Sequence, residues 1–460
     1  MKTKFLFLLL SIFMVVSCYN DESHVVETSI SDEEDSIIDG KISLYRAIDN
    51  ADFVYKSIEG VDFRRRSIRS VDVLTRSDLN VNVADTRFVS TSDENEQPLA
   101  YVVNYENNGG YAILAADVQL PPVICVGDEG SFSTQDFIAF TQNNISTRSS
   151  IIRDNAQEIQ YALISNSLLL PSIEIENFPI SGVDTTVILK CLPLVPTKWK
   201  QRDPYNFYAP LDPSSGEKCL AGCVPIAAAQ TLTSLCYHHN WRPTTQISDN
   251  YSVDWYALNR MIYADTARFA YGNYSSNALN VASLIRAVGE NVDANYTDSV
   301  TTAYTSRLIS TFQQFGMNSV VYGNNSFFSK QKVTEEDIFD MIIVKNYPVI
   351  ASAQNSVTGD DGHTFVLDGW LRLEYSILSL IPDDDDNSSL TGWSQFDNVQ
   401  YRFDLVHVNF GWNGSYDGYF LLGAFDLTED EYHDYAEEND IPYTTTIVYD
   451  LNVDYLKYDI

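Results

Sequence analysis

The chain has few cysteines for its length, six in 460 residues. Small exported domains that depend on disulfides are much richer in cysteine, so this chain is not a disulfide scaffold. Its length instead allows two or three domains, each with its own hydrophobic core. Four cysteines have no role suggested by their surroundings, and the sequence does not fix their pairing: Cys125, Cys191, Cys219 and Cys236.

Basic residues are scarce as well. The chain has 29 lysines and arginines against 63 aspartates and glutamates, which gives a net charge of −34. A nucleic acid or an anionic membrane surface would repel such a chain, so neither is expected as a partner. Solubility is the simplest role for the excess of acidic residues.

Long apolar runs are missing except at the N-terminus. There, Lys2 and Lys4 precede the twelve-residue run 5–16, which is the layout of an export signal and is too short to span a bilayer. The run ends in VVSC, which resembles the bacterial lipoprotein box. This resemblance implies a signal peptide over 1–18 and lipidation of Cys18; an ordinary signal peptide is the alternative.

The residues after Cys18 fit this interpretation. Asn20, Asp21 and Glu22 resemble the surface-export signals of some Gram-negative lipoproteins. No later segment reaches about eighteen apolar residues, so we expect a soluble body held at the membrane by lipid alone. The predicted location is the outer membrane or the cell surface.

The composition then changes along the chain. Residues 19–45 are acidic and aperiodic, as in a flexible tether. Residues 100–132 contain short β-type runs with turn signals, and 134–166 have helical spacing. The pattern weakens over 167–190, which we interpret as an exposed linker.

From residue 190 onward the pattern predicts one α+β domain. Residues 379–393 interrupt its strands with a segment that we expect to be a solvated loop. The four consecutive aspartates in that loop lack the spacing of calcium ligands, so no metal site is expected there.

The segment EKCLAGCVPIAAAQTLTSLCYHHNW, residues 217–241, is the most informative. Good helix formers follow Cys223, which places this cysteine at a helix N-terminus. Unpaired N–H groups and the helix dipole there favour a thiolate, as a nucleophile requires. A buried structural cysteine is the alternative. A zinc site formed by Cys219, Cys223 and His238 or His239 is not expected, because a continuous helix from 223 to 238 would span about 22 Å.

A nucleophilic cysteine needs an imidazole partner. Four of the six histidines lie in unsuitable places: His24 in the tether, His238 and His239 far along the Cys223 helix, and His433 in an acidic surface segment. His363 follows a glycine and opens an apolar strand, whereas His407 shares a strand face with Asn409. These features favour His363 over His407 but leave both open.

Together these segments resemble the streptopain family, papain-like cysteine proteases of bacteria. GCVPIAAAQ is similar to the family's nucleophile segment, GHTFVLDG to its histidine segment, HVNFGWNGSYDGYF to the following strand and turn, and KWKQRDPYN to the start of the mature enzyme. The similarity spans about 200–420. AYVVNYENNGGYAILAADV and VGDEGSF resemble the family's pro-segment.

The resemblance implies the roles of individual residues. Cys223 is the nucleophile, His363 the base and acid, Gln201 the side-chain donor to the oxyanion, and Asn409 the residue that orients or flanks the imidazole. Gly362, Phe410 and Trp412 line the substrate cleft, and Phe410 stands where the family usually has tryptophan. Thr364 and Pro225 also depart from the family's usual residues, and 371–400 is longer.

These observations predict a papain-like cysteine protease fold of the α+β class, preceded by a small α+β pro-domain. The domains are a signal peptide over 1–18, a tether over 19–45, an inhibitory pro-segment over 46–185 and a catalytic domain over 186–460. The pro-segment inhibits the enzyme until cleavage between 167 and 192, and Asp136 is its nearest counterpart to the family's inhibitory side chain.

The predicted function is a cysteine endopeptidase that is made as a zymogen and acts on protein or peptide substrates without a cofactor or metal. Two alternatives remain at this point. One is a catalytically inactive surface-binding lipoprotein, against which the intact catalytic residues argue. The other is a thiol amidase or transglutaminase on the same fold, which fold analogy does not exclude.

Overall fold

The computed structural model describes residues 40–79, 98–142, 155–170, 180–243, 250–261, 275–323, 332–355, 362–382, 393–425 and 451–460. All of them belong to one compact unit, Ser36–Ile460. The predicted signal peptide, Cys18 and most of the tether lie outside the described residues. No helix within the described ranges is both long enough and apolar enough to cross a membrane.

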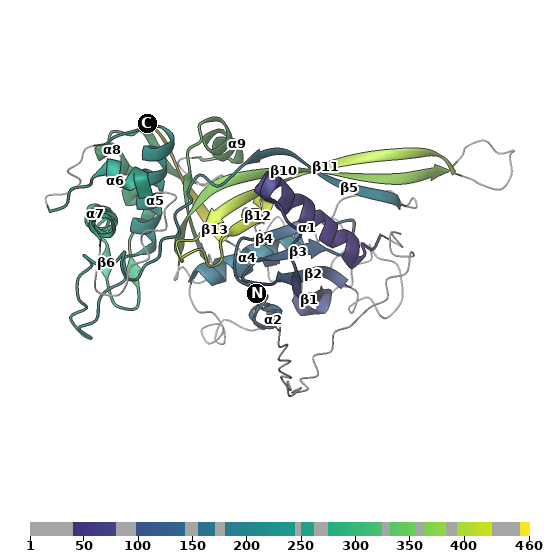
Figure 1. Ribbon diagram of the computed structural model, residues 1–460, viewed down its shortest axis with the longest axis horizontal. Helices are drawn as coiled ribbons and strands as arrows, with labels where there is room; N and C mark the ends of the chain where they lie inside the picture. The colour runs from purple at the N-terminus through teal and green to yellow at the C-terminus, as the bar shows by residue number, and fades with distance from the viewer. Residues whose placement is uncertain are drawn as a thin grey trace, which may run out of the picture. The chain divides into compact units, whose positions relative to one another are not determined.

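The main feature of the described part is one eleven-stranded sheet (Figure 1). Ten strands follow one another in the order β1-β2-β3-β4-β12-β11-β10-β9-β13-β8, and β5 pairs with β10. The strands are β1 (Ile68–Thr75), β2 (Pro98–Tyr105), β3 (Tyr111–Ala115), β4 (Val123–Gly127), β5 (Ile180–Cys191), β8 (Asn318–Gly323), β9 (Val349–Asn355), β10 (His363–Pro382), β11 (Trp393–Asn409), β12 (Gly418–Leu421) and β13 (Leu451–Asp459).

Helices cover the sheet and gather at one end of it. The helix α5 packs against α6, α7 and β10, and Figure 1 shows α5 to α8 together beyond one end of the sheet. A two-stranded ribbon, β6 (Asn295–Tyr296) and β7 (Thr301–Thr302), lies in the same region. The helices are α1 (Leu44–Glu59), α2 (Thr134–Gln142), α4 (Asn155–Leu169), α5 (Cys223–His238), α6 (Trp255–Met261), α7 (Ser276–Asn291), α8 (Leu308–Gln314) and α9 (Glu335–Phe339).

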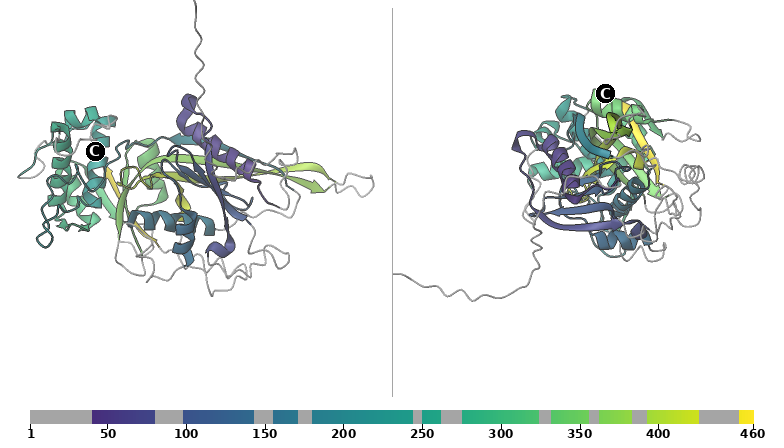
Figure 2. Two further views of the ribbon diagram at one scale, coloured as in Figure 1. Left: turned by 60° about the horizontal axis from the view of Figure 1, so that its bottom comes forward. Right: turned by 90° about the vertical axis from the view of Figure 1, so that its right-hand side faces the viewer.

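The predicted strands and helices of the pro-segment are confirmed. β2, β3 and β4 form an antiparallel meander, with α1 on one face and α2 and α4 on the other (Figure 2). Neighbouring residues of β2 point to these opposite faces, as strand geometry requires. Tyr105 packs edge-on against Tyr55 of α1, whereas Asn104 hydrogen-bonds both the N–H and the carbonyl of Phe132 on the α2 side.

The fold begins slightly before the end of the predicted tether. The Ile42 N–H donates to the Ala116 carbonyl oxygen at 2.9 Å, and Lys41 pairs with Asp117 at 2.8 Å. Ser43 then caps α1, because its hydroxyl accepts from the Arg46 N–H. Residues 40–45, which the prediction placed in the tether, therefore belong to the described fold.

The second half of the predicted linker is a strand. Residues 180–191 form β5, which pairs antiparallel with β10 from Ile180 to Cys191. The β-branched and aliphatic residues of VDTTVILK favour this extended pairing, which the weak periodicity of the segment concealed. A domain boundary at 185 would cut β5, so the strand belongs with the sheet of the predicted catalytic domain.

The predicted loop of 379–393 is also shorter than expected. β10 runs to Pro382 and β11 starts at Trp393, so the lengthened region 371–400 is largely an antiparallel hairpin. Residues 383–392, including all four aspartates, lie outside the described residues. The alternation in LRLEYSIL explains the strand, since Leu371, Leu373, Tyr375 and Ile377 are all buried.

Candidate active site

Cys223 is the first residue of α5, as predicted. The preceding residue, Gly222, has a φ of 95°, and a Cβ atom there would lie 2.9 Å from Cγ2 of Thr301. Only glycine accommodates both this backbone conformation and this close approach. The whole of α5 from Val224 to Cys236 is buried, which fixes the thiol at the edge of a rigid helix.

The half-buried Cys223 thiol is surrounded mainly by Thr364. Burial raises the pKa of this thiol, and the N–H groups of Thr364, Val224 and Cys223 itself, together with the Thr364 hydroxyl, act in the opposite direction. The Thr364 hydroxyl also lies 2.8 Å from the Thr305 hydroxyl and donates to Ser352 Oγ at 3.3 Å. Thr364 is therefore held in place beside the nucleophile by its own hydrogen bonds.

His363 lies beside Thr364 on β10, but its ring makes other contacts. Nε2 is 2.8 Å from the Phe410 carbonyl oxygen, which can only accept, so Nε2 carries the proton. The ring is stacked with the rings of Phe365 and Phe410. Burial in these apolar surroundings lowers the pKa of His363 to about 4, which the Phe410 carbonyl only partly offsets. The imidazole is neutral at pH 7.

Cys223 and His363 do not form an ion pair in this structure, although the thiol contacts Thr364, the residue after His363. The thiol interacts with the backbone N–H and the hydroxyl of Thr364, whereas the His363 ring bonds to the Phe410 carbonyl. Among the described contacts of these two residues, no hydrogen bond joins them. With a thiol of raised pKa and a neutral imidazole, this arrangement does not supply the thiolate that peptide hydrolysis needs.

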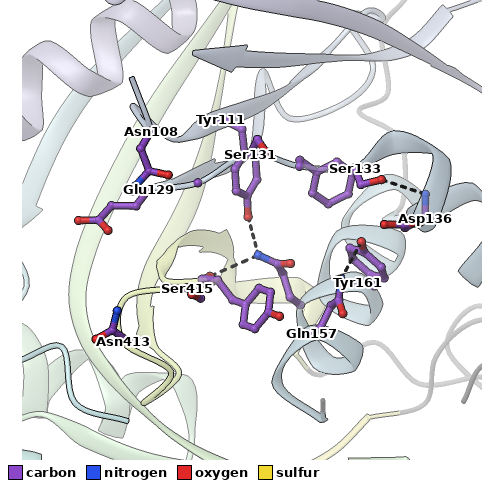
Figure 3. Close-up of a pocket in the computed structure, with 14 residues that line it drawn as sticks. Asn108, Tyr111, Glu129, Ser131, Ser133, Asp136, Gln157, Tyr161, Asn413 and Ser415 are labelled. Carbon is purple, nitrogen blue, oxygen red and sulfur yellow. Dashed lines mark hydrogen bonds between the residues drawn. The ribbon is translucent and has the colours of Figure 1, made fainter. Parts of the chain in front are cut away.

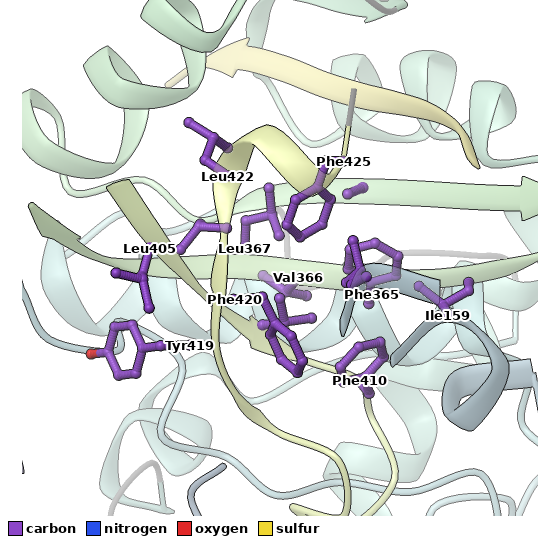
Figure 4. Close-up of a cluster of buried hydrophobic side chains, with 14 of the residues drawn as sticks. Ile159, Phe365, Val366, Leu367, Leu405, Phe410, Tyr419, Phe420, Leu422 and Phe425 are labelled. Carbon is purple, nitrogen blue, oxygen red and sulfur yellow. The ribbon is translucent and has the colours of Figure 1, made fainter. Parts of the chain in front are cut away.

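The predicted pro-segment contacts the histidine strand directly. The side-chain amide of Asn155, the first residue of α4, donates to the Gly362 carbonyl oxygen at 3.3 Å. Ile159, one turn later, belongs to the same buried cluster as Phe365 and Phe410 (Figure 4). α4 therefore contacts the chain just before His363 and the aromatic rings that hold its imidazole.

Asp136, the predicted inhibitory residue, lies elsewhere. Its backbone N–H bonds to Ser133 Oγ, and its side chain helps to line a pocket of about 440 Å³ that includes Asn413 and Ser415 (Figure 3). At the base of this pocket Gln160 donates to the Tyr111 hydroxyl at 2.6 Å. The structure thus gives Asn155, which the sequence analysis did not single out, the contact with the histidine strand.

Gln201 lies next to the nucleophile segment. Its carbonyl oxygen accepts from the Ala221 N–H at 2.8 Å, two residues before Cys223, and the residue is buried. The segment 195–201 is thereby tied to the turn that leads into α5. The backbone of Gln201 therefore lies beside the turn before Cys223, and its role as the oxyanion donor stays a prediction.

Asn409 has a different environment from the one implied for it. Its side chain accepts from Gln230 of α5 at 3.2 Å and donates to the Thr197 carbonyl at 3.0 Å. These bonds join β11, α5 and the segment before Gln201, and none of them reaches His363. Trp412, one of the three residues implied to line the cleft, is half-buried against the core.

His407, the histidine ranked second, is also fully occupied. Its Nδ1 lies 2.6 Å from Asp368 Oδ1 of β10, and its Nε2 lies 3.0 Å from Asp128 Oδ2, which follows β4. The contact between His407 and Asp368 follows from the pairing of β10 with β11, which the spacing of the two residues in the sequence does not reveal. The participation of Asp128, 279 residues away, has no local signal.

The described cysteines form no disulfide with one another. Cys125, Cys191, Cys219, Cys223 and Cys236 are all free thiols. Burial raises the pKa of Cys125 above its ordinary value, and it raises that of Cys191 and of Cys236 to about 11. Thiols buried in this way are less reactive than a thiol at a helix N-terminus.

Comparisons with known proteins agree with this organisation. The Peptidase C10 family model matches residues 199–420, and the Spi protease inhibitor model matches 69–144. Streptopain from Streptococcus pyogenes serotype M28 (strain MGAS6180) is 26% identical over 349 residues, covering 70% of this chain and 74% of the relative. Streptopain from Streptococcus pyogenes serotype M1 is 25% identical over the same length.

Two solved structures from Prevotella intermedia are also similar. A prointerpain A fragment covers 78% of this chain and 96% of its own length, with 20% identity and a TM-score of 0.43. Active wild-type interpain A covers 59% and 95%, with 22% identity and a TM-score of 0.36. The two family models match on either side of β5 and carry the assignment: the segment 199–420 belongs to the peptidase C10 (streptopain) family of cysteine peptidases, and the segment 69–144 in front of it matches the Spi protease inhibitor.

Proposed function

We propose that the chain is an exported lipoprotein zymogen whose processed form hydrolyses internal peptide bonds through Cys223 and His363. One observation carries this proposal. Within the segment that matches the peptidase family, Cys223 begins a buried helix and lies against the strand that carries His363. A nucleophile on one rigid element and its base on the adjacent one is the arrangement that papain-like chemistry requires.

The reaction follows from these groups. The Cys223 thiolate attacks the peptide carbonyl carbon, and the new oxyanion accepts hydrogen bonds from the Cys223 N–H and the Gln201 side chain. The amine leaves with a proton from the His363 imidazolium, which gives a thioester. His363 then takes a proton from water, which attacks the thioester and releases the carboxylic acid and the thiolate. No cofactor takes part.

The proposed zymogen form keeps these groups apart. His363 must leave the Phe410 carbonyl and turn toward Cys223 before the ion pair can form, and Asn155 and Ile159 hold the strand and rings around it. Removal of the pro-segment would free these contacts. Because β5 is part of the sheet, we place the activating cleavage before Ile180, within the predicted interval of 167–192.

Export and anchoring rest on the first residues of the chain. Cys18 takes the lipid and becomes the N-terminus of the mature lipoprotein, at the outer membrane or the cell surface. Replacing Cys18 with serine, which cannot take the lipid, should move the protein from the membrane fraction to the soluble fraction. Detergent-dependent membrane association of Cys18→Ser would contradict the anchor.

Casein hydrolysis tests the enzymatic proposal. Processed wild-type protein should cleave casein and lose activity with a thiol-directed inhibitor, and the Cys223→Ala variant should have no activity. Ammonia release or amine incorporation without new peptide termini would instead indicate an amidase or transglutaminase. No reaction of either kind in fully processed protein would indicate an inactive binding protein.

A further inference from the structure

The pro-segment sheet and the catalytic sheet meet along a very short pair of strands. β4 and β12 share only three residue pairs, Gly127 with Gly418, Val126 with Tyr419, and Cys125 with Phe420. The contact continues for one further backbone hydrogen bond, from the Asp128 N–H to the Asp417 carbonyl at 2.9 Å. So short a ladder gives little specificity by itself, since backbone groups are the same in every strand.

A group of four titratable side chains lies at the end of this ladder, and all of them except Asp128 are buried. It consists of Asp128, Asp368, His407 and Asp417, and we refer to it as the His407 cluster. His407 bonds to Asp368 at 2.6 Å and to Asp128 at 3.0 Å, and its side chain is only 3% exposed. Three members belong to the catalytic sheet, and Asp128 alone comes from the pro-segment.

The charges in the cluster make Asp128 important. Burial would lower the pKa of His407, but Asp368 and Asp128 outweigh it and hold this pKa well above its ordinary value, so the ring is a cation. Burial raises the pKa of Asp417 to about 7. Burial would also raise the pKa of Asp128, but His407 outweighs it and holds this pKa below its ordinary value. The cation is balanced by one carboxylate from each sheet.

We infer that the edge of β12 and His407 form the recognition surface for the pro-segment, and that it accepts a strand followed directly by an aspartate, here Gly127-Asp128. The inference rests on the proposed role of the pro-segment as a removable inhibitor. Removing Asp128 takes one of two carboxylates from the buried His407 cation, which is more costly than losing an ion pair in which both partners are exposed.

The chain contains a matched exposed pair at the same boundary. Glu129, the residue after Asp128, pairs with Lys198, and the two side chains are 40% and 42% exposed. The two neighbouring acidic residues thus bridge the same two parts of the molecule, and their own side chains are similarly exposed, 34% for Asp128 and 40% for Glu129; they differ in their partners, because His407 is 3% exposed and Lys198 is 42% exposed. Because only Asp128 enters the cluster, only Asp128 should determine recognition.

The fit also requires the absence of a side chain on β12. A Cβ atom at Gly418 would lie 2.4 Å from the Val126 carbonyl oxygen and 2.9 Å from Gly127 Cα. These nearest atoms all belong to the pro-segment strand. Gly418→Ala should therefore prevent the β4–β12 pairing while meeting no closer atom of the catalytic sheet.

The pairing should depend on pH at both ends of the scale. Since docking lowers the pKa of Asp128, its contribution is present at neutral pH and is lost as pH falls through that lowered value. Since the carboxylates raise the pKa of His407, its contribution is lost as pH rises through that raised value. Among the described residues, seven other groups interact with the cluster: Tyr55, Arg66, Cys125, Cys191, Lys198, His238 and Tyr419.

Hydrogen exchange of the full-length Cys223→Ala precursor tests the inference without any need for activity. In this background, Asp128→Asn should speed amide exchange in β4 and β12 by about 10- to 100-fold, whereas Glu129→Gln should change it by less than about 3-fold. Exchange in α7 serves as the internal reference and should not change. Gly418→Ala should speed exchange in β4 and β12 as Asp128→Asn does.

Equal effects of Asp128→Asn and Glu129→Gln would overturn the inference. If Asp128→Asn does not fold, Asp128→Glu and Glu129→Asp provide a milder pair, and faster exchange in β4 and β12 for Asp128→Glu alone would support it. No difference within that pair would overturn it. Because all variants lack the nucleophile, these results are separate from casein hydrolysis, which tests the proposed function.

Discussion

His363 and His407 lie on neighbouring strands of the same sheet, and each is only 3% exposed, yet His363 is neutral and His407 is a cation. His363 has two aromatic rings and one carbonyl oxygen around it, and its pKa falls to about 4. His407 has carboxylates on both nitrogens, and its pKa rises well above the ordinary value. Partners, and not the degree of burial, decide whether a buried histidine is charged.

The difference also indicates which histidine can move. One hydrogen bond and ring stacking hold His363, so turning it toward Cys223 breaks little. Turning His407 would leave two carboxylates without their cation, one of them fully buried. The catalytic role therefore fits His363, and a fixed structural role fits His407.

The largest expected effect is on peptide hydrolysis by the processed enzyme. Cys223→Ala should abolish it, because no other group can form the thioester. His363→Ala should lower kcat/KM by about 10²- to 10⁴-fold, the range for loss of a general acid–base. Both variants should keep the melting temperature of the wild type within a few degrees. A comparable loss for a correctly folded His407→Gln protein, with His363→Ala active, would reverse the assignment.

Replacement of His407 should lower the stability of the precursor more than replacement of His363, the reverse of their order for activity. His407→Gln leaves Asp368 buried without a cation and should cost the precursor about 3–5 kcal/mol in urea denaturation. His363→Gln keeps a hydrogen-bond donor near the Phe410 carbonyl and should cost much less. Equal losses of stability would show that the carboxylates around His407 do not distinguish the two sites.

Gln201→Ala tests the oxyanion contribution and should lower kcat by about 10²-fold with a smaller change in KM. The residue supports the turn before Cys223 through its backbone, which alanine keeps. The Gln201→Glu variant provides a control of similar size that lacks the donor. If both variants keep wild-type turnover, the oxyanion donor lies elsewhere.

Acid should weaken the precursor through His363. Because its folded pKa is about 4 and its ordinary value is 6.5, the unfolded chain takes up a proton that the folded chain refuses as pH falls between these values. Stability from the neutral ring is complete above about pH 6.5 and is lost toward pH 4. His363→Phe should reduce this slope in urea denaturation, measured against wild type at each pH.

The smallest effect concerns Thr364, which contacts the thiol in place of His363. Thr364→Val removes the hydroxyl that favours the Cys223 thiolate but keeps the shape of the side chain. Alkylation of Cys223 in the precursor should therefore shift to higher pH by a fraction of a unit. Thr305→Val, which removes only the partner of that hydroxyl, is the matched control and should shift it less.

Local pattern predicted much of this molecule. The helix that begins at Cys223, the three-stranded meander before it and the strand that opens with His363 all follow from spacing and turn chemistry. β5 and the part of the β10–β11 hairpin that extends into the predicted loop were missed, because β5 and the hairpin are stabilised by pairing with one another, which short-range periodicity does not report.

The site was harder to predict than the fold around it. The sequence indicated Cys223 and His363 but could not show that Thr364, the residue after His363, contacts the thiol. The contacts of Asn155 with Gly362 and of Asp128 with His407 join residues more than 200 positions apart. Such contacts depend on the assembled sheet and leave no signal in either segment alone.

Covalent labelling of Cys223 tests the central claim most directly. Precursor and processed protein are treated with a thiol-directed probe across pH 5 to 9, and the modified cysteine is identified by mass spectrometry. The account predicts rapid labelling of Cys223 near neutral pH in the processed wild type, and slow labelling that requires alkaline pH in the precursor and in processed His363→Ala. Labelling of Cys223 at the same rate and pH in all three proteins would contradict the claim that His363 activates this thiol only after the pro-segment has left.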